Sequence, residues 1–251
     1  MRTLGTLLCI LILTSLFAAG QTSVPQSGAS LTAQEIASRL AESNGKRKQA
    51  LQSYTGERQY HLLYTGFPGK HEADMVVRVS YQAPADKQFT VVSESGSSLI
   101  VNRVFKKLLE TEKESADAES QARSAVSSDN YAFELLGKED LNGRPSYILK
   151  VEPKTSNKLL YRGKIWVDAA DFAVAKIEAE PAKRPSFWIS NTVIHHTYRK
   201  VGEFWLPEQN ESTTEVRLGG HAVLSIRYRE YKVVPETRVS GAATLAETSG
   251  N

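Results

Sequence analysis

Few residues of this 251-residue chain are of types and at spacings that could do chemistry. Of its five histidines, His195 and His196 are adjacent. Neighbouring side chains of a β-strand point to opposite faces, so these two cannot serve one site. His61 and His71 lie on consecutive predicted strands, but we see no carboxylate spaced to complete a set of three or four converging metal ligands. We therefore predict no metal site and no cofactor.

Nucleophilic and acid–base patterns are equally weak. Asp168 and Asp171 form a close carboxylate pair, but they lie in a predicted tight turn, where aspartate typically caps backbone amides. The segment Ser127-Ser128-Asp129 lacks the strand–elbow–helix frame of a hydrolase serine. The chain also lacks a phosphate-binding loop and a dinucleotide fingerprint. The sequence thus predicts no catalytic residue and no enzyme.

Composition and charge further restrict the functional class of the protein. The chain is 41% hydrophobic and 24% charged, which is ordinary for a globular protein. Its net charge is +3, whereas a dedicated nucleic-acid-binding protein is expected to carry a strongly basic stripe. We therefore expect no nucleic-acid partner, and we expect a monomer.

The N-terminal segment has the pattern of an export signal. Arg2 precedes an apolar stretch over residues 4–17, and Ala18-Ala19-Gly20 supplies the small residues of a cleavage site. The apolar stretch is shorter than the ~20 residues of a membrane span. We predict a signal peptide over residues 1–20, cleaved after Gly20, and a periplasmic protein; an uncleaved anchor is the alternative. Cys9, the only cysteine, lies within this segment.

The rest of the chain divides into four parts. We predict a flexible linker over 21–30, a single domain over 31–235 and a disordered tail over 236–251. Thr32 and Glu35 form a capping box that starts a helix predicted over 33–52.

Within the domain, alternating apolar residues predict strands at 56–65, 71–81 and 87–93. An amphipathic helix follows over 98–114, and 115–129 is a weakly packed helix or loop. From 131 onward strands return, with a hairpin marked by Asn142-Gly143. About ten strands joined mostly by tight turns predict an α+β fold with one curved antiparallel meander.

This order of elements resembles the LolA/LolB-like outer-membrane lipoprotein-sorting proteins and their RseB-type relatives. The closest local matches are residues 163–168 (GKIWVD), 174–177 (VAKI) and 202–207 (GEFWLP). The resemblance implies an unclosed half-barrel with helices on its concave face and an apolar cavity for acyl chains. It implies a periplasmic, non-catalytic carrier or binding protein for a lipid or lipoprotein acyl group. The alternative is an envelope sensor or protein-interaction module on the same fold.

Two helices are few for a sheet of this size, so part of the concave face could stay open to a ligand. The same residues could equally pack together into a dry core, and both interpretations remain open. Lys183 and Arg184 beside the aromatic pair 187–188 could also hold an anionic head group or a membrane surface. The predicted ligand-binding residues are Tyr64, Met75, Val77, Ile100, Val104, Leu108, Phe187 and Trp188.

Overall fold

The computed structural model describes residues 30–115, 117–184, 189–217 and 219–235. The predicted signal peptide, all of the linker except Ser30, and the predicted tail lie outside the described residues. The same holds for Phe187 and Trp188, so their predicted contact with a ligand stays a prediction. Among the described helices, none combines the length and the apolar character needed to cross a membrane.

The first element is helix α1 (Ala33–Ala50), and its start confirms the predicted capping box. The Thr32 hydroxyl accepts a hydrogen bond from the Glu35 amide at 3.2 Å, while the Glu35 carboxylate accepts one from the Thr32 amide at 2.8 Å. The helix gives way directly to a strand that begins at Leu51, so the predicted helix end at 52 and strand start at 56 are both late.

The described residues form ten antiparallel strands in one open sheet, which confirms the predicted fold class. The strands are β1 (Leu51–Thr65), β2 (His71–Gln82), β3 (Asp86–Gly96), β4 (Tyr131–Leu141), β5 (Arg144–Pro153), β6 (Tyr161–Asp168), β7 (Val174–Pro181), β8 (Ile189–Val201), β9 (Phe204–Val216) and β10 (Gly220–Pro235). Asn142 and Gly143 both have positive φ in the β4–β5 hairpin, as the sequence predicts.

The order across the sheet is β3-β2-β1-β10-β9-β8-β7-β6-β5-β4, so the prediction of one continuous meander is wrong. Two meanders are joined where β1 pairs with β10. Strands β3 and β4, although consecutive in the chain, therefore form the two opposite edges. Pairing between strands so distant in sequence leaves no local pattern, which is why the sequence did not indicate it.

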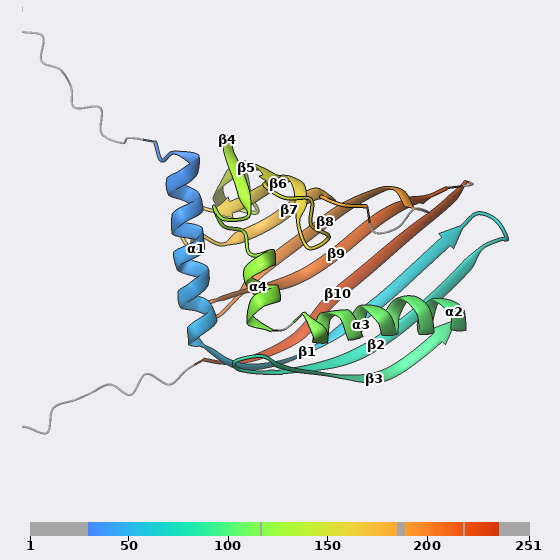
Figure 1. Ribbon diagram of the computed structural model, residues 1–251. Helices are drawn as coiled ribbons and strands as arrows, with labels where there is room; N and C mark the ends of the chain where they lie inside the picture. Colours follow the sequence, from blue (N-terminus) through green and yellow to red (C-terminus); the bar gives the residue numbers. More distant parts are fainter. Residues whose placement is uncertain (1–29, 116, 185–188, 218, 236–251) are drawn as a thin grey trace, which may run out of the picture. The chain divides into compact units, whose positions relative to one another are not determined.

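The segment between the two edge strands carries the remaining helices and lies over one face of the sheet (Figure 1). Helix α2 (Ser98–Ile100), a π-helical turn (Val101–Phe105) and helix α3 (Lys106–Glu114) are continuous, which confirms the predicted helix over 98–114. Helix α4 (Ala118–Ser124) follows and buries no residue, as expected of a weakly packed segment.

The helix-covered face holds two separate apolar cores. The first lies between α1 and strands β4–β7, and the second lies between the α2–α3 segment and strands β1, β2 and β10. Members of the first include Ile36, Leu40, Leu149, Val151 and Ile165. Members of the second include Tyr60, Met75, Val77, Ile100 and Phe105. The π-helical turn decides which leucine enters the second core: Leu109 is 7% exposed, whereas Leu108 is 38% exposed.

The exposure of Leu108 departs from the predicted apolar stripe. A π-helical turn contains one residue more than an α-helical turn, so the buried face passes from Ile100 to Phe105 and then to Leu109. A regular helical period, which the sequence analysis assumed, would instead keep Val104 and Leu108 in line with Ile100. The π turn leaves no signature in the hydrophobic pattern.

Candidate functional site

A cavity of about 470 Å³ lies between α1, the end of α4 with the residues just after it, and strands β6–β9. We call it the helix–sheet cavity. Ligand pockets commonly have volumes of about 300–1,000 Å³ and mostly apolar walls. Apolar and aromatic side chains make up most of this wall. The lining residues are Asn44, Arg47, Lys48, Leu51, Ser124, Val126, Tyr161, Ala173, Val174, Ile177, Tyr198, Phe204, Trp205 and Leu206.

The floor of the helix–sheet cavity is built by neighbouring strands. Ile177 on β7, Tyr198 on β8 and Leu206 on β9 come from three strands that pair in succession. Tyr161 adds an aromatic ring from β6. The sheet therefore brings together four side chains that lie far apart in the sequence, and α1 and the end of α4 border the space above them.

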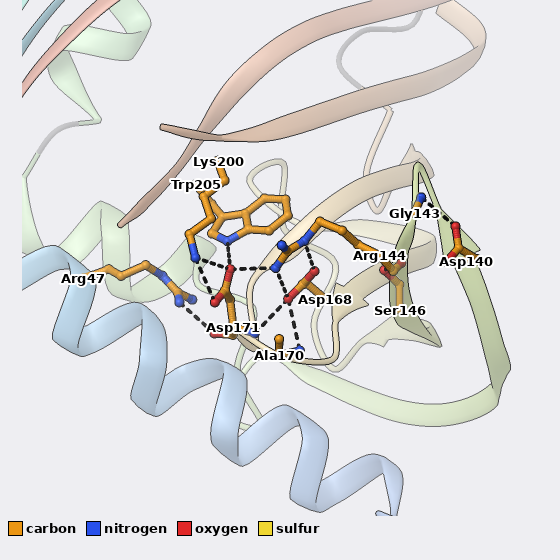
Figure 2. Close-up of polar contacts among 10 residues, drawn as sticks. All are labelled: Arg47, Asp140, Gly143, Arg144, Ser146, Asp168, Ala170, Asp171, Lys200 and Trp205. Carbon is orange, nitrogen blue, oxygen red and sulfur yellow. Dashed lines mark hydrogen bonds and ion pairs between the residues drawn. The ribbon is translucent and has the colours of Figure 1, made fainter. Parts of the chain in front are cut away.

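One wall of the cavity is fixed by a network of ion pairs and hydrogen bonds around Asp168 and Asp171 (Figure 2). Asp168 is 1% exposed and accepts two hydrogen bonds from Arg144, at 2.6 and 2.9 Å. It also accepts the backbone amides of Ala170 and Asp171, at 3.1 and 2.7 Å. This confirms the prediction that aspartate caps the β6–β7 turn, because the carboxylate of Asp168 is fully engaged in holding it.

Asp171 extends the network to the residues that line the cavity (Figure 2). Its carboxylate accepts hydrogen bonds from Trp205 Nε1 at 2.9 Å and from Lys200 Nζ at 3.1 Å. Partial burial would raise the pKa of Asp171, but the hydrogen bonds from Lys200 and Trp205 outweigh burial and lower it. Arg47 of α1 donates to the backbone carbonyls of Asp171 and Phe172, at 2.8 and 2.7 Å. Arg47 and Trp205 are therefore held in place before any ligand arrives.

The polar groups of the cavity floor are uncharged at neutral pH. Burial raises the pKa of Tyr198 to about 12 and raises that of Tyr161 as well. The Tyr198 hydroxyl lies 3.4 Å from Nδ1 of His196. Burial, with a contribution from Arg58, lowers the pKa of His196 to about 4, so the ring is neutral. The floor thus adds no charge to the apolar wall.

A second polar cluster lies under α3. Arg58 of β1 is 6% exposed and donates to both carboxylate oxygens of Glu112, at 2.5 and 2.9 Å, while Lys87 of β3 donates at 2.8 Å. Phe89 and Tyr228 rings lie 5.3 and 5.0 Å from the Arg58 guanidinium. Although burial opposes ionisation, the hydrogen bonds and charges of Arg58 and Lys87 lower the pKa of Glu112 to about 2. This cluster ties the end of α3 to the sheet.

The structure describes six of the predicted ligand-binding residues; five of them belong to the second apolar core or pack against it, and the sixth, Leu108, is 38% exposed. Met75, Val77 and Ile100 are buried members of this core, and each is at most 3% exposed. None of the six lines the helix–sheet cavity, which lies over the other half of the sheet. Their role in binding stays a prediction. The six residues are Tyr64, Met75, Val77, Ile100, Val104 and Leu108.

None of the predicted ligand-binding residues that the structure describes belongs to the lining of the helix–sheet cavity. The local signals of this lining are the segments 202–207 and 174–177, both quoted above for the fold resemblance. The first contributes Phe204, Trp205 and Leu206 to the lining, and the second contributes Val174 and Ile177. Tyr161 and Tyr198 carry no recognisable motif, because only strand pairing makes them neighbours.

His61 has acidic neighbours that the sequence analysis did not foresee. In the β1–β2 ladder His61 lies opposite Asp74, and its Nδ1 is 2.9 Å from the Asp74 carboxylate. Glu72 is close enough that one ligand atom from each of the three lies within 4.8 Å of the others. The expectation that no carboxylate is spaced to complete a set of metal ligands with His61 is therefore wrong, because strand register sets the neighbours. The Glu72 carboxylate also pairs with Lys70 at 3.1 Å.

Several solved structures are similar to this chain. A DUF1329 family protein from Desulfovibrio piger is 14% identical, with a TM-score of 0.39, over 85% of this chain and 96% of that one. An outer membrane lipoprotein-sorting protein domain from Vibrio parahaemolyticus is 13% identical, with a TM-score of 0.38, over 82% of this chain and 93% of that one. A LolA superfamily protein from Nitrosomonas europaea is 13% identical, with a TM-score of 0.34, over 82% of this chain and 94% of that one.

Structures of the LolA superfamily are thus among those that this chain resembles, as its sequence predicts. No ligand or role is transferred from these structures to this chain. No curated protein matches the chain. Because a family described as "Uncharacterized protein" matches residues 108–242, more than half of its length, the chain belongs to that family.

Proposed function

We propose that this protein binds the apolar chain of a lipid or of an acylated molecule in the helix–sheet cavity, without chemical turnover. The observation that carries the proposal is a 470 Å³ cavity whose wall is mostly apolar and aromatic. We place a lipid ahead of a protein partner, because a peptide backbone in such a wall would leave polar groups unpaired, which is costly. The export pattern over residues 1–20 supports action in the periplasm.

The volume and the apolar wall of the cavity determine how binding affinity should depend on the length of the ligand chain. An apolar cavity of about 150 Å³ can hold benzene, so a cavity of 470 Å³ has room for a considerably longer chain. Each methylene moved from water into an apolar site contributes about 0.8 kcal/mol, which corresponds to about a fourfold gain in affinity. Affinity should therefore rise steeply with chain length until the cavity is full.

The test is a calorimetric titration of the purified protein with octanoate, decanoate and dodecanoate. We expect one binding site and a gain of about fourfold per methylene across the series. A flat series, or binding only above the concentration at which these ligands form micelles, would contradict the proposal.

A matched pair of variants locates the site. Ser124 lines the cavity and is exposed, so Ser124→Trp places an indole at the mouth with little cost to the fold. Ala122 lies on the same short helix, is exposed and does not line the cavity, so Ala122→Trp is the control. We expect Ser124→Trp to weaken dodecanoate binding at least tenfold and Ala122→Trp to leave it unchanged. Equal effects of the two variants would place the ligand elsewhere.

A further inference from the structure

The charged residues that line the helix–sheet cavity are all basic. Its lining contains Arg47 and Lys48, both from the last turns of α1, and no aspartate or glutamate. The remaining polar groups of the lining are neutral, since the pKa of Tyr161 and that of Tyr198 are raised by burial. A ligand in this cavity therefore meets positive charge at one place only, at the end of α1.

The two cations differ in how far they are already engaged. The Arg47 guanidinium donates to the carbonyls of Asp171 and Phe172 and to the side chain of Asn44. In the part of the chain that the structure describes, the Lys48 ammonium has neither a hydrogen bond nor an ion pair. Lys48 is also exposed. It can therefore contact a ligand group that remains in water at the cavity mouth while its aliphatic stem lies along the wall.

A neighbouring cavity differs in charge, because acidic residues are part of its lining. It has a volume of about 630 Å³, shares Arg47 and Phe204 with the helix–sheet cavity, and is also lined by Asp171, Glu203 and Lys46. Asp171 is committed to Arg144, Lys200 and Trp205. Of the acids that line it, Glu203 is thus the one that could attract a cationic head group, and Lys46 and Arg47 line the same cavity.

We propose that the helix–sheet cavity selects amphiphiles with an anionic head group, such as a carboxylate or a phosphate, and that Lys48 holds that head group at the mouth. This inference rests on the proposed function, because it requires an apolar chain in the same cavity. It adds a preference among ligands of equal chain length. An exposed ion pair contributes up to about 1 kcal/mol, so the expected preference is about threefold to fivefold.

The experiment compares dodecanoate with dodecan-1-ol and with dodecyltrimethylammonium by calorimetry at low salt. The three probes share a twelve-carbon chain and differ in the charge of the head group. The variants are Lys48→Gln and Lys46→Gln, the latter a control because Lys46 pairs with Glu42 at 2.6 Å and does not line this cavity. We expect the ratio of the two dissociation constants, dodecan-1-ol over dodecanoate, to fall about threefold in Lys48→Gln and to stay unchanged in Lys46→Gln.

The outcomes separate the two claims. If none of the three probes binds, the proposed function fails. If all three bind and the ratio is the same in the wild type and in Lys48→Gln, the cavity is confirmed as a chain-binding site and the anionic preference is refuted. Tighter binding of dodecyltrimethylammonium than of dodecanoate would also refute it and would point to Glu203. A fall at high salt in the wild-type ratio of dissociation constants, dodecan-1-ol over dodecanoate, would support the anionic preference, because salt screens exposed charges.

Discussion

The ion-pair cluster under α3 offers a sharp test of how the helical segment is held on the sheet. Replacing Glu112 with glutamine removes the carboxylate that Arg58 and Lys87 share, while it keeps the size of the side chain. The Arg58 guanidinium is 6% exposed, so its charge would be left with no opposite charge in the cluster. Breaking a fully buried ion pair costs about 3–5 kcal/mol. The side chain of Glu112 is 35% exposed, so solvent screening reduces the expected loss to about 2 kcal/mol.

The loss should depend on pH. The pKa of Glu112 in the folded protein is about 2, below its ordinary value of 4.5. A carboxyl group with a lowered pKa stabilises the fold fully above pH 4.5, and this contribution disappears as pH falls toward 2. The glutamine variant has no such group. The difference in stability between the wild type and Glu112→Gln should therefore shrink by about half between pH 5 and pH 3.

The assay is urea unfolding followed by circular dichroism, at pH 7, 5 and 3. Glu110→Gln is the matched control, since Glu110 is 63% exposed and pairs with Lys107 at 3.3 Å. We expect that control to change the free energy of unfolding by less than about 0.5 kcal/mol. A loss for Glu112→Gln that is the same at pH 7 and pH 3 would show that the charge of Glu112 does not carry the stabilisation, and would refute the reasoning.

Two further predictions concern the fold. Leu109→Ala should cost about 3 kcal/mol and Leu108→Ala less than 1, because only Leu109 is buried behind the π-helical turn; urea unfolding measures both, and equal costs would contradict the phase shift. Asp168→Asn should lower the free energy of unfolding by at least about 2 kcal/mol, because the single oxygen of an amide cannot accept both hydrogen bonds from Arg144 and those from the two turn amides. A loss below about 0.5 kcal/mol in the same assay would contradict this.

The local features of the fold could be predicted from sequence because each depends on residues close together in the chain. Thr32 and Glu35 lie three residues apart, and they cap α1 as predicted. Asn142 and Gly143 form the predicted tight turn between β4 and β5. Their conformations depend on intrinsic backbone preference and local hydrogen bonds.

Features that depend on distant pairing could not be predicted. The β1–β10 ladder, in which Tyr60 lies opposite Ile226, makes β3 and β4 the two edges of the sheet. Tyr161, Ile177 and Tyr198 lie on β6, β7 and β8, which are consecutive in the chain, but no motif marks these three residues as neighbours in the cavity floor. The apolar pattern shows which side chains are buried, but it does not show which of them leave a space between them. Of the predicted ligand residues, Met75, Val77 and Ile100 lie in the second apolar core, and their role in binding stays a prediction.

The central claim is that an apolar chain lies in the helix–sheet cavity, and photo-crosslinking tests it most directly. Dodecanoate with a diazirine at its methyl end would be bound, irradiated and mapped by mass spectrometry of the digested protein. We expect adducts on the segments that carry Ile177, Tyr198 and Leu206. Adducts confined to the segments of Met75 and Ile100, or no adduct that unlabelled dodecanoate competes away, would contradict the claim.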